Sequence, residues 1–181
     1  MRLLFIGPPG AGKGTQAALV GKELGIPHIS TGEMFRQHVA RGTDLGKRVT
    51  AILDEGSYVP DDITVAMLAE RLDEPDAEPG FILDGFPRTG PQVEALDRLL
   101  GSEGLDRVIL FDVDEDALVN RMMFRGRADD AEETIRNRFK IYQEQTAPLV
   151  EEYDDRGLLV TVDGVGEVRV VTGRLLKAVR S

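Results

Sequence analysis

The stretch that decides the fold lies near the N-terminus and reads Leu3-Leu4-Phe5-Ile6-Gly7-Pro8-Pro9-Gly10-Ala11-Gly12-Lys13-Gly14-Thr15. An apolar run leads into a glycine-rich turn with a lysine, and a helical pattern follows over residues 16–24. Glycines leave backbone N–H groups free to face phosphate oxygens, and the positive end of the following helix adds to their attraction. The order of strand, loop, lysine and helix predicts a phosphate-binding loop rather than a glycine turn without a ligand.

Five short apolar runs predict strands at residues 3–6, 26–29, 81–83, 108–113 and 158–162. Three of them are almost continuously apolar, as parallel strands are when helices cover both faces. Helical periodicity lies between the strands, for example at Val93, Leu96 and Leu100. We therefore expect an α/β fold, a P-loop doubly wound parallel sheet of about five strands with helices on both faces. Pro148 predicts that the last long helix kinks or restarts near Ala147.

Length and composition bound the remaining possibilities. The 181 residues suit a single domain, 1–181, with insertions at about residues 30–59 and 126–136, where helical segments do not lead straight back to a strand. A net charge of −10 disfavours general binding to nucleic acid or to an anionic membrane. The absence of cysteine excludes disulfides and cysteine-based zinc sites. Neither a signal peptide nor a membrane span is apparent, so we expect a cytoplasmic protein, by default a monomer.

Further motifs are spread over nearly the whole chain. They are Gly14-Thr15-Gln16, Ser30-Thr31-Gly32-Glu33-Met34-Phe35-Arg36, Leu83-Asp84-Gly85-Phe86-Pro87-Arg88-Thr89, Arg127-Ala128-Asp129-Asp130 and Thr146-Ala147-Pro148-Leu149. In these motifs the sequence resembles the adenylate kinases of the nucleoside monophosphate kinase family. The resemblance implies reversible transfer of the terminal phosphoryl group of ATP to AMP, which gives two ADP and needs Mg²⁺. It also implies that residues 30–59 form a helical NMP-binding insertion and residues 126–136 a short lid loop.

The predicted ATP side begins with the phosphate loop, whose residues are Gly10, Ala11, Gly12, Lys13, Gly14 and Thr15. Gly14 stands where the generic phosphate loop has Ser or Thr, which puts direct magnesium ligation by the Thr15 hydroxyl in doubt. Arg121 and Arg125 share one helix face, which fits either a triphosphate between them or a solvated basic face, and the resemblance favours the triphosphate. Gly164 and Val165 follow the last strand; the resemblance implies that they line the adenine of ATP, and a plain turn is the equal alternative.

Asp84 ends a predicted buried strand, so its carboxylate should lie beside the phosphate loop at the carboxyl edge of the sheet. The usual phosphate-loop arrangement has an acidic residue there, and the resemblance implies that Asp84 acts on Mg²⁺ through metal-bound water, with no direct protein ligand. The alternative is an aspartate that caps the following turn.

The predicted AMP side depends on the resemblance. Arg36 and Arg88 would hold the phosphate of AMP bidentately. Thr31, Val59 and Gln92 would face adenine, and Thr31 favours AMP because uridylate and cytidylate kinases usually carry a small residue there. The full predicted AMP set is Thr31, Arg36, Val59, Gly85, Arg88, Gln92, Arg127 and Arg138.

Catalysis in such an enzyme is expected to be positioning and charge stabilisation, with no general base. The predicted catalytic residues are Lys13, Asp84, Arg88, Arg121, Arg125, Arg127 and Arg138. His28 and His38 are assigned no role, and Phe124, where the family often has glycine, is expected to limit hinge freedom at the lid. Three alternatives stay open: a UMP or CMP kinase on the same fold, a phosphate-loop switch protein that binds nucleotide without making product, and a kinase for a small metabolite such as shikimate.

Overall fold

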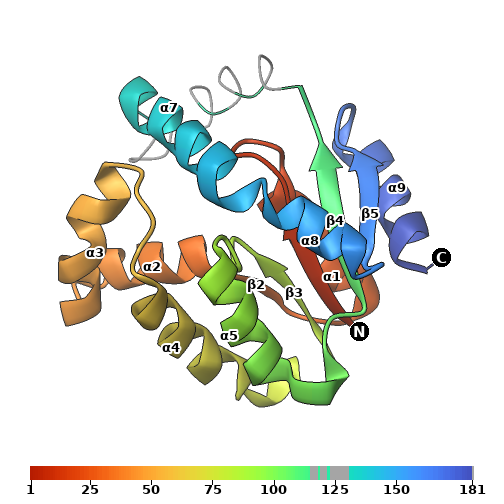
Figure 1. The fold of residues 1–181 in the computed structure, drawn as a ribbon, viewed down its shortest axis with the longest axis horizontal. Coiled ribbons are helices and arrows are strands. Elements are labelled where there is room, and N and C mark those ends of the chain that lie inside the picture. Colours follow the sequence, from red (N-terminus) through yellow and green to blue (C-terminus); the bar gives the residue numbers. More distant parts are fainter. Residues whose placement is uncertain (115–117, 119–121, 123–130, 181) are drawn as a thin grey trace.

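A computed structural model describes residues 1–114, 118, 122 and 131–180 of the chain. The centre of the molecule is a parallel sheet in the order β2-β3-β1-β4-β5 (Figure 1). Its strands are β1 (Arg2–Ile6), β2 (His28–Ser30), β3 (Phe81–Asp84), β4 (Arg107–Asp112) and β5 (Leu159–Asp163). Each predicted strand is confirmed to within about two residues at either end, the boundary error expected of sequence patterns.

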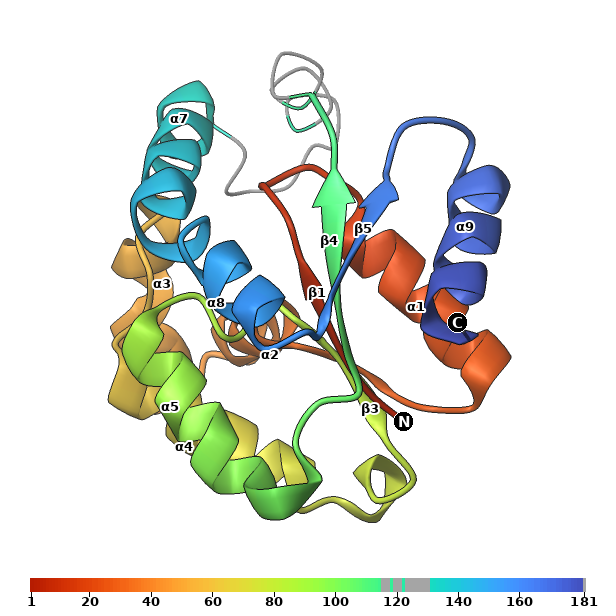
Figure 2. The same ribbon diagram turned by 45° about the vertical axis from the view of Figure 1, so that its right-hand side comes forward.

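Helices cover both faces of the sheet. On one face lie α1 (Lys13–Leu24) and α9 (Val168–Arg180); on the other lie α4 (Asp61–Leu72), α5 (Gly90–Leu100) and α8 (Leu149–Asp155) (Figure 2). Side chains of β1 alternate between two cores, with Leu3 and Phe5 packed in the first and Leu4 and Ile6 in the second. Because both faces are buried, β1 is apolar at every position from Leu3 to Ile6, and the doubly wound prediction is confirmed.

Residues between β2 and α4 form a small helical unit with its own apolar cluster. Helix α2 (Thr31–Ala40) and helix α3 (Asp44–Asp54) enclose Phe35 and Val49 together with Val59 and Met67. Helix α3 begins where the hydroxyl of Thr43 accepts the backbone N–H of Gly46 at 3.0 Å, a side-chain N-cap. Because Met67 lies on α4, the segment packs against that helix beside the sheet and does not extend the sheet.

The chain after the predicted lid is helical. Helix α7 (Glu132–Ile141) passes into a π-helical turn, η3 (Tyr142–Thr146), and α8 starts again at Leu149 directly after Pro148. The predicted restart near Ala147 is thus confirmed, since proline cannot supply the N–H that would continue the helix. Of the predicted lid loop, residues 126–130 lie outside the described residues and residues 132–136 belong to α7. Glu132 and Glu133 favour that helical start because carboxylates stabilise a helix N-terminus.

Two short 3₁₀ turns complete the described elements, η1 (Pro75–Ala77) before β3 and η2 (Gly101–Glu103) after α5. No helix in the described part of the chain is long and apolar enough to cross a membrane.

Candidate active site

The phosphate loop turns directly into α1. Gly10 and Gly12 have φ of +83° and +91°, the left-handed region that favours glycine. Gly12 is the N-cap of α1, and the first backbone bond that closes a helical turn runs from Gln16 N–H to the Gly12 carbonyl at 3.0 Å. The helix therefore begins three residues before the predicted residue 16. Because the turn at Gly12 starts the helix, the N–H groups of the residues at 13, 14 and 15 form its first turn and have no carbonyl within it to bond.

The ammonium of Lys13 lies over this loop. Its Nζ donates to the carbonyl oxygens of Gly7 at 2.7 Å and Pro8 at 2.9 Å. The base of the loop is packed closely, since a Cβ on Gly10 would lie 2.9 Å from Cγ of Met122. Gly12 faces open space instead. The loop is thus anchored on its inner side and open at the start of the helix, where donors for an anion are gathered.

Asp84 lies beside the loop, as its place at the end of a buried strand predicts. A Cβ on Gly14 would lie 3.3 Å from its Oδ2 atom, and Nε2 of His28 lies 3.4 Å from the same oxygen. Burial raises the pKa of Asp84, but the hydrogen bond to His28 and the positive charges of Lys13, His28 and Arg88 together hold that pKa below its usual value. An ionised carboxylate at this position could bind Mg²⁺ as an oxygen ligand or accept hydrogen bonds from water bound to the ion.

Sequence reasoning missed His28 as a partner of Asp84. The two residues lie 56 positions apart, and they meet because β2 pairs in parallel with β3, which sets Ser30 opposite Asp84. A lone histidine in a short strand carries no local signal of this contact. Only the strand order reveals it.

A cavity next to this carboxylate brings together most of the predicted AMP-binding residues. It is lined by Thr31, Val59, Gly85, Arg88 and Gln92, with Gly32, Phe35, Leu53, Ser57, Tyr58 and Thr64. The Thr31 hydroxyl donates to the Gly85 carbonyl at 2.8 Å, which joins the start of α2 to the end of β3. Thr31 and Gln92 line the cavity and are each only 2% exposed, so their polar groups are buried. The roles of these residues in binding stay predictions.

The guanidinium of Arg88 is held at the wall of this cavity. Its Nε donates to the Gly85 carbonyl at 2.6 Å, and its Cζ lies 4.9 Å from the centre of the Tyr58 ring. The Thr146 hydroxyl donates to the Arg88 carbonyl at 2.9 Å and lies 2.8 Å from the Tyr58 hydroxyl. Gly85 has φ of +82°, and a Cβ there would lie 2.7 Å from Nη2 of Arg88. These contacts fix the direction in which the guanidinium of Arg88 points. A side chain at position 85 would collide with it, so that position requires glycine.

Other predicted residues lie further from the cavity or outside the described residues. Arg36 forms an ion pair with Glu33 at 3.0 Å and lies next to Gly32, which does line the cavity. Arg138 lies on α7 beside Gly56, whose Cβ would be 3.0 Å from Cγ of Arg138. Outside the described residues are Arg121, Arg125, Arg127 and Phe124.

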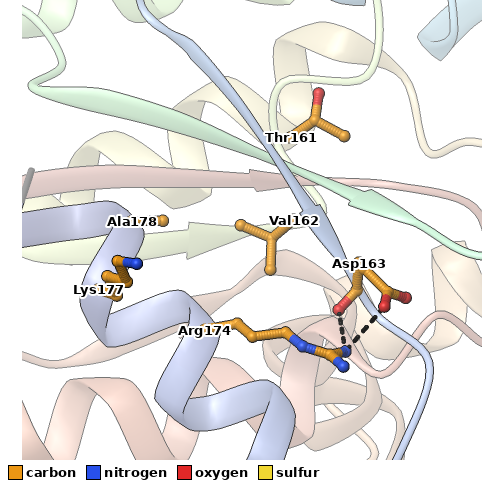
Figure 3. Close-up of a pocket in the computed structure, with 6 residues that line it drawn as sticks. All are labelled: Thr161, Val162, Asp163, Arg174, Lys177 and Ala178. Carbon is orange, nitrogen blue, oxygen red and sulfur yellow. Dashed lines mark hydrogen bonds and ion pairs between the residues drawn. The ribbon is translucent and has the colours of Figure 1, made fainter.

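Gly164 and Val165 lie in a well-braced turn after β5. The Gly164 N–H donates to the Asp112 carbonyl at 2.9 Å, and the Val165 N–H donates to Oδ1 of Asp163 at 2.9 Å. Figure 3 shows Arg174 of α9 reaching Asp163 at the edge of a surface pocket. Arg174 donates to the carbonyls of Asp163 at 3.0 Å and Val165 at 2.7 Å and pairs with the Asp163 carboxylate at 3.0 Å. Sequence reasoning missed Arg174 because a helical arginine near the C-terminus has no distinguishing pattern.

Comparisons with known proteins agree with this arrangement. Residues 5–158 match the family model described as adenylate kinase. The chain is 52% identical over 180 residues to the adenylate kinase of Nocardia farcinica and 51% identical over 180 residues to that of Corynebacterium glutamicum, with 98% of each chain covered. It is 50% identical over 187 residues to the adenylate kinase of Thermobifida fusca, covering 100% of this chain and 99% of the relative. With its phosphate loop, five-stranded parallel sheet and near full-length similarity, the chain belongs to the adenylate kinase family.

Proposed function

We propose that this protein is an ATP:AMP phosphotransferase that makes two ADP from ATP and AMP and runs the reaction in both directions. The observation that supports this most directly is the end of β3. Asp84 faces the phosphate loop, and the next residue, Gly85, lines the cavity that also contains Arg88. A donor phosphate on the loop and an acceptor phosphate in the cavity would therefore lie on either side of the same strand end, which is the arrangement that direct transfer between them requires.

Catalysis in this site requires positioning more than proton transfer. AMP carries an anionic phosphate oxygen that can attack without a general base. Arg88 would hold that phosphate through its planar guanidinium, and Arg36 would need to turn from Glu33 toward the cavity to join it. Lys13 would exchange the carbonyls of Gly7 and Pro8 for phosphate oxygens of ATP. Fixed positive charge then stabilises the transferring group.

Mg²⁺ fits the residues around the loop. The carboxylate of Asp84 is kept ionised there and would hold the ion through its bound water, while the nucleotide phosphates supply direct oxygen ligands. When bound, the ion neutralises charge on the phosphates. Asp84 itself orients the loop side of the site through its contacts with His28 and with the start of α1.

The remaining assignments complete the proposal. Residues 1–181 form one kinase domain in which residues 30–59 close over AMP and residues 126–136 close over ATP, so that water is excluded. Gly164 and Val165 line the adenine of ATP, and Arg121, Arg125, Arg127 and Arg138 spread the charge of the phosphates.

The protein acts as a cytoplasmic monomer on free nucleotides, with no nucleic acid or membrane partner. Hydrogen exchange with and without a bisubstrate analogue tests closure: unchanged exchange in both segments would exclude it.

The decisive assay measures ADP formation from ATP and Mg²⁺ with AMP, UMP or CMP as acceptor. We expect AMP to be strongly preferred, because Thr31 and Gln92 present buried polar groups to the cavity. Preference for UMP or CMP would contradict the base assignment. Calorimetry that finds only one bound nucleotide at saturation would instead indicate a switch protein and contradict the whole proposal.

A further inference from the structure

We propose that Asp61 determines base selectivity in the acceptor cavity by holding the side-chain amide of Gln92 in one of its two orientations. A cavity with a fixed amide accepts a base that offers a ring-nitrogen acceptor beside an amino group. It rejects a base of the same shape that offers a ring N–H beside a carbonyl. The inference rests on the proposed function, since it concerns the same acceptor site.

Gln92 is tied at both ends of its amide. Its Oε1 accepts the backbone N–H of Arg88 at 2.8 Å, and its Nε2 donates to Oδ1 of Asp61 at 2.6 Å. The other carboxylate oxygen of Asp61 accepts the hydroxyl of Thr89 at 3.0 Å. Asp61 opens α4, and Thr89 is the N-cap of α5, so two helix starts hold this group of side chains together.

The two partners of the amide differ in kind. A backbone N–H can only donate, and an ionised carboxylate can only accept. If the amide of Gln92 turned over, its oxygen would face the Asp61 carboxylate and its NH₂ would face the Arg88 N–H. Two hydrogen bonds would become two repulsive contacts at a side chain that is 2% exposed. Asp61 and Arg88 therefore permit a single orientation.

One donor and one acceptor of the amide remain for a ligand. The amide nitrogen carries two hydrogens and the oxygen has two lone pairs, and the protein uses one of each. Adenine has an acceptor at N1 beside the 6-amino donor, whereas hypoxanthine has N1–H beside a 6-carbonyl. A freely rotating amide would match either base by turning over. An amide held by Asp61 matches one order only, so Asp61 is a positioning residue for the choice between AMP and IMP.

The test measures kcat/KM with AMP and with IMP for the wild type, Asp61→Asn and Asp62→Asn. The asparagine at position 61 keeps the size of the side chain but can donate as well as accept, so it no longer opposes the turned amide. We expect the AMP-to-IMP ratio to fall by about tenfold in Asp61→Asn, because one of two orienting partners is lost and unpaired polar groups are the main source of such discrimination. The KM for ATP should not change.

Asp62→Asn is the matched control. Asp62 is the next residue, is exposed, and would lose the same charge, so its ratio should stay at the wild-type value. A ratio that is unchanged in Asp61→Asn, or that falls equally in Asp62→Asn, would overturn the proposal. Simple destabilisation lowers both rates together and leaves the ratio in place, which separates positioning from a structural role.

Two further readouts keep the inference testable in every case. In the wild-type protein, NMR should show side-chain amide hydrogens of Gln92 that exchange with water far more slowly than those of exposed glutamines; equal exchange would contradict the fixed amide. A wild type that prefers pyrimidine monophosphates would refute the proposed function. The role of Asp61 would then be tested by the ratio of kcat/KM for CMP to that for UMP. Cytosine offers a ring-nitrogen acceptor beside an amino group, and uracil offers a ring N–H beside a carbonyl, so the two bases differ in the same way as adenine and hypoxanthine.

Discussion

Gly46 offers a sharp test of how the helical unit between β2 and α4 is packed, through the substitution Gly46→Ala. A Cβ at this position would lie 2.2 Å from the carbonyl oxygen of His38, 2.4 Å from its carbonyl carbon and 2.7 Å from the backbone N of Val39. All three atoms belong to the backbone of α2, so no side-chain rotation can relieve the contact. To reach an ordinary packing distance of about 3.5–4.0 Å, α3 would have to move away from α2 by roughly 1.3–1.8 Å.

The magnitude follows from two opposing effects. Overpacking costs up to about 3 kcal/mol, and rigid backbone places this case at the upper end. Replacing a helical glycine by alanine stabilises the helix by about 1 kcal/mol. We expect a net loss of about 2 kcal/mol, or a fall of about 4–8 °C in the melting temperature for a chain of this size. Separation of the helices would also loosen the apolar cluster to which Phe35 and Val49 belong.

The assay combines urea unfolding followed by circular dichroism with hydrogen exchange of the α3 amides, because a small unit can open before the whole domain unfolds. Gly173→Ala is the matched control. Gly173 also lies inside a helix, but nothing lies within 4 Å of its Cβ position, so alanine should stabilise the protein by about 0.5–1 kcal/mol. If Gly46→Ala matched or exceeded wild-type stability and α3 protection, the close approach of the two helices would be refuted.

Four other outcomes are expected. Lys13→Met and Arg88→Ala should each lower kcat/KM by about 10²-fold or more in a protein that still folds, because each removes a positive charge from beside the transferring phosphoryl group; near-normal rates would contradict their roles. Tyr153→Phe should leave stability unchanged or raise it by about 1 kcal/mol in urea unfolding, since among the described residues the buried Tyr153 hydroxyl has no hydrogen-bond partner; a clear loss would reveal one. The pKa of Asp84 lies below its usual 3.8, so its ionised form stabilises the fold above that pH, and the stability gap between the wild type and Asp84→Asn should shrink as the pH falls below 3.8; a gap constant from pH 7 to pH 2 would oppose this. Arg174→Met should raise the KM for ATP severalfold with little change in the KM for AMP, because it frees the turn after β5, and equal changes in both would count against that link.

Local features of the chain were readable without the structure. The glycine loop, the apolar strands and the break at Pro148 depend on neighbouring residues, through glycine's backbone freedom, burial on both strand faces and proline's missing N–H. Asp84 was placed correctly for the same reason, since the end of a parallel strand lies at the carboxyl edge of the sheet. The start of α1 was placed too late because glycines near a helix start weaken the helical pattern although they permit the turn.

Other features depended on contacts between distant parts of the chain. Asp84 meets His28 across 56 positions, Gln92 meets Asp61 across 31, and Arg174 meets Asp163 across 11. Each pair is formed by polar side chains that look like ordinary surface residues in the sequence. The sequence determined which elements form and where the phosphate loop lies. Only the tertiary structure decided these partners, because strand order and helix packing bring together groups that no local pattern relates.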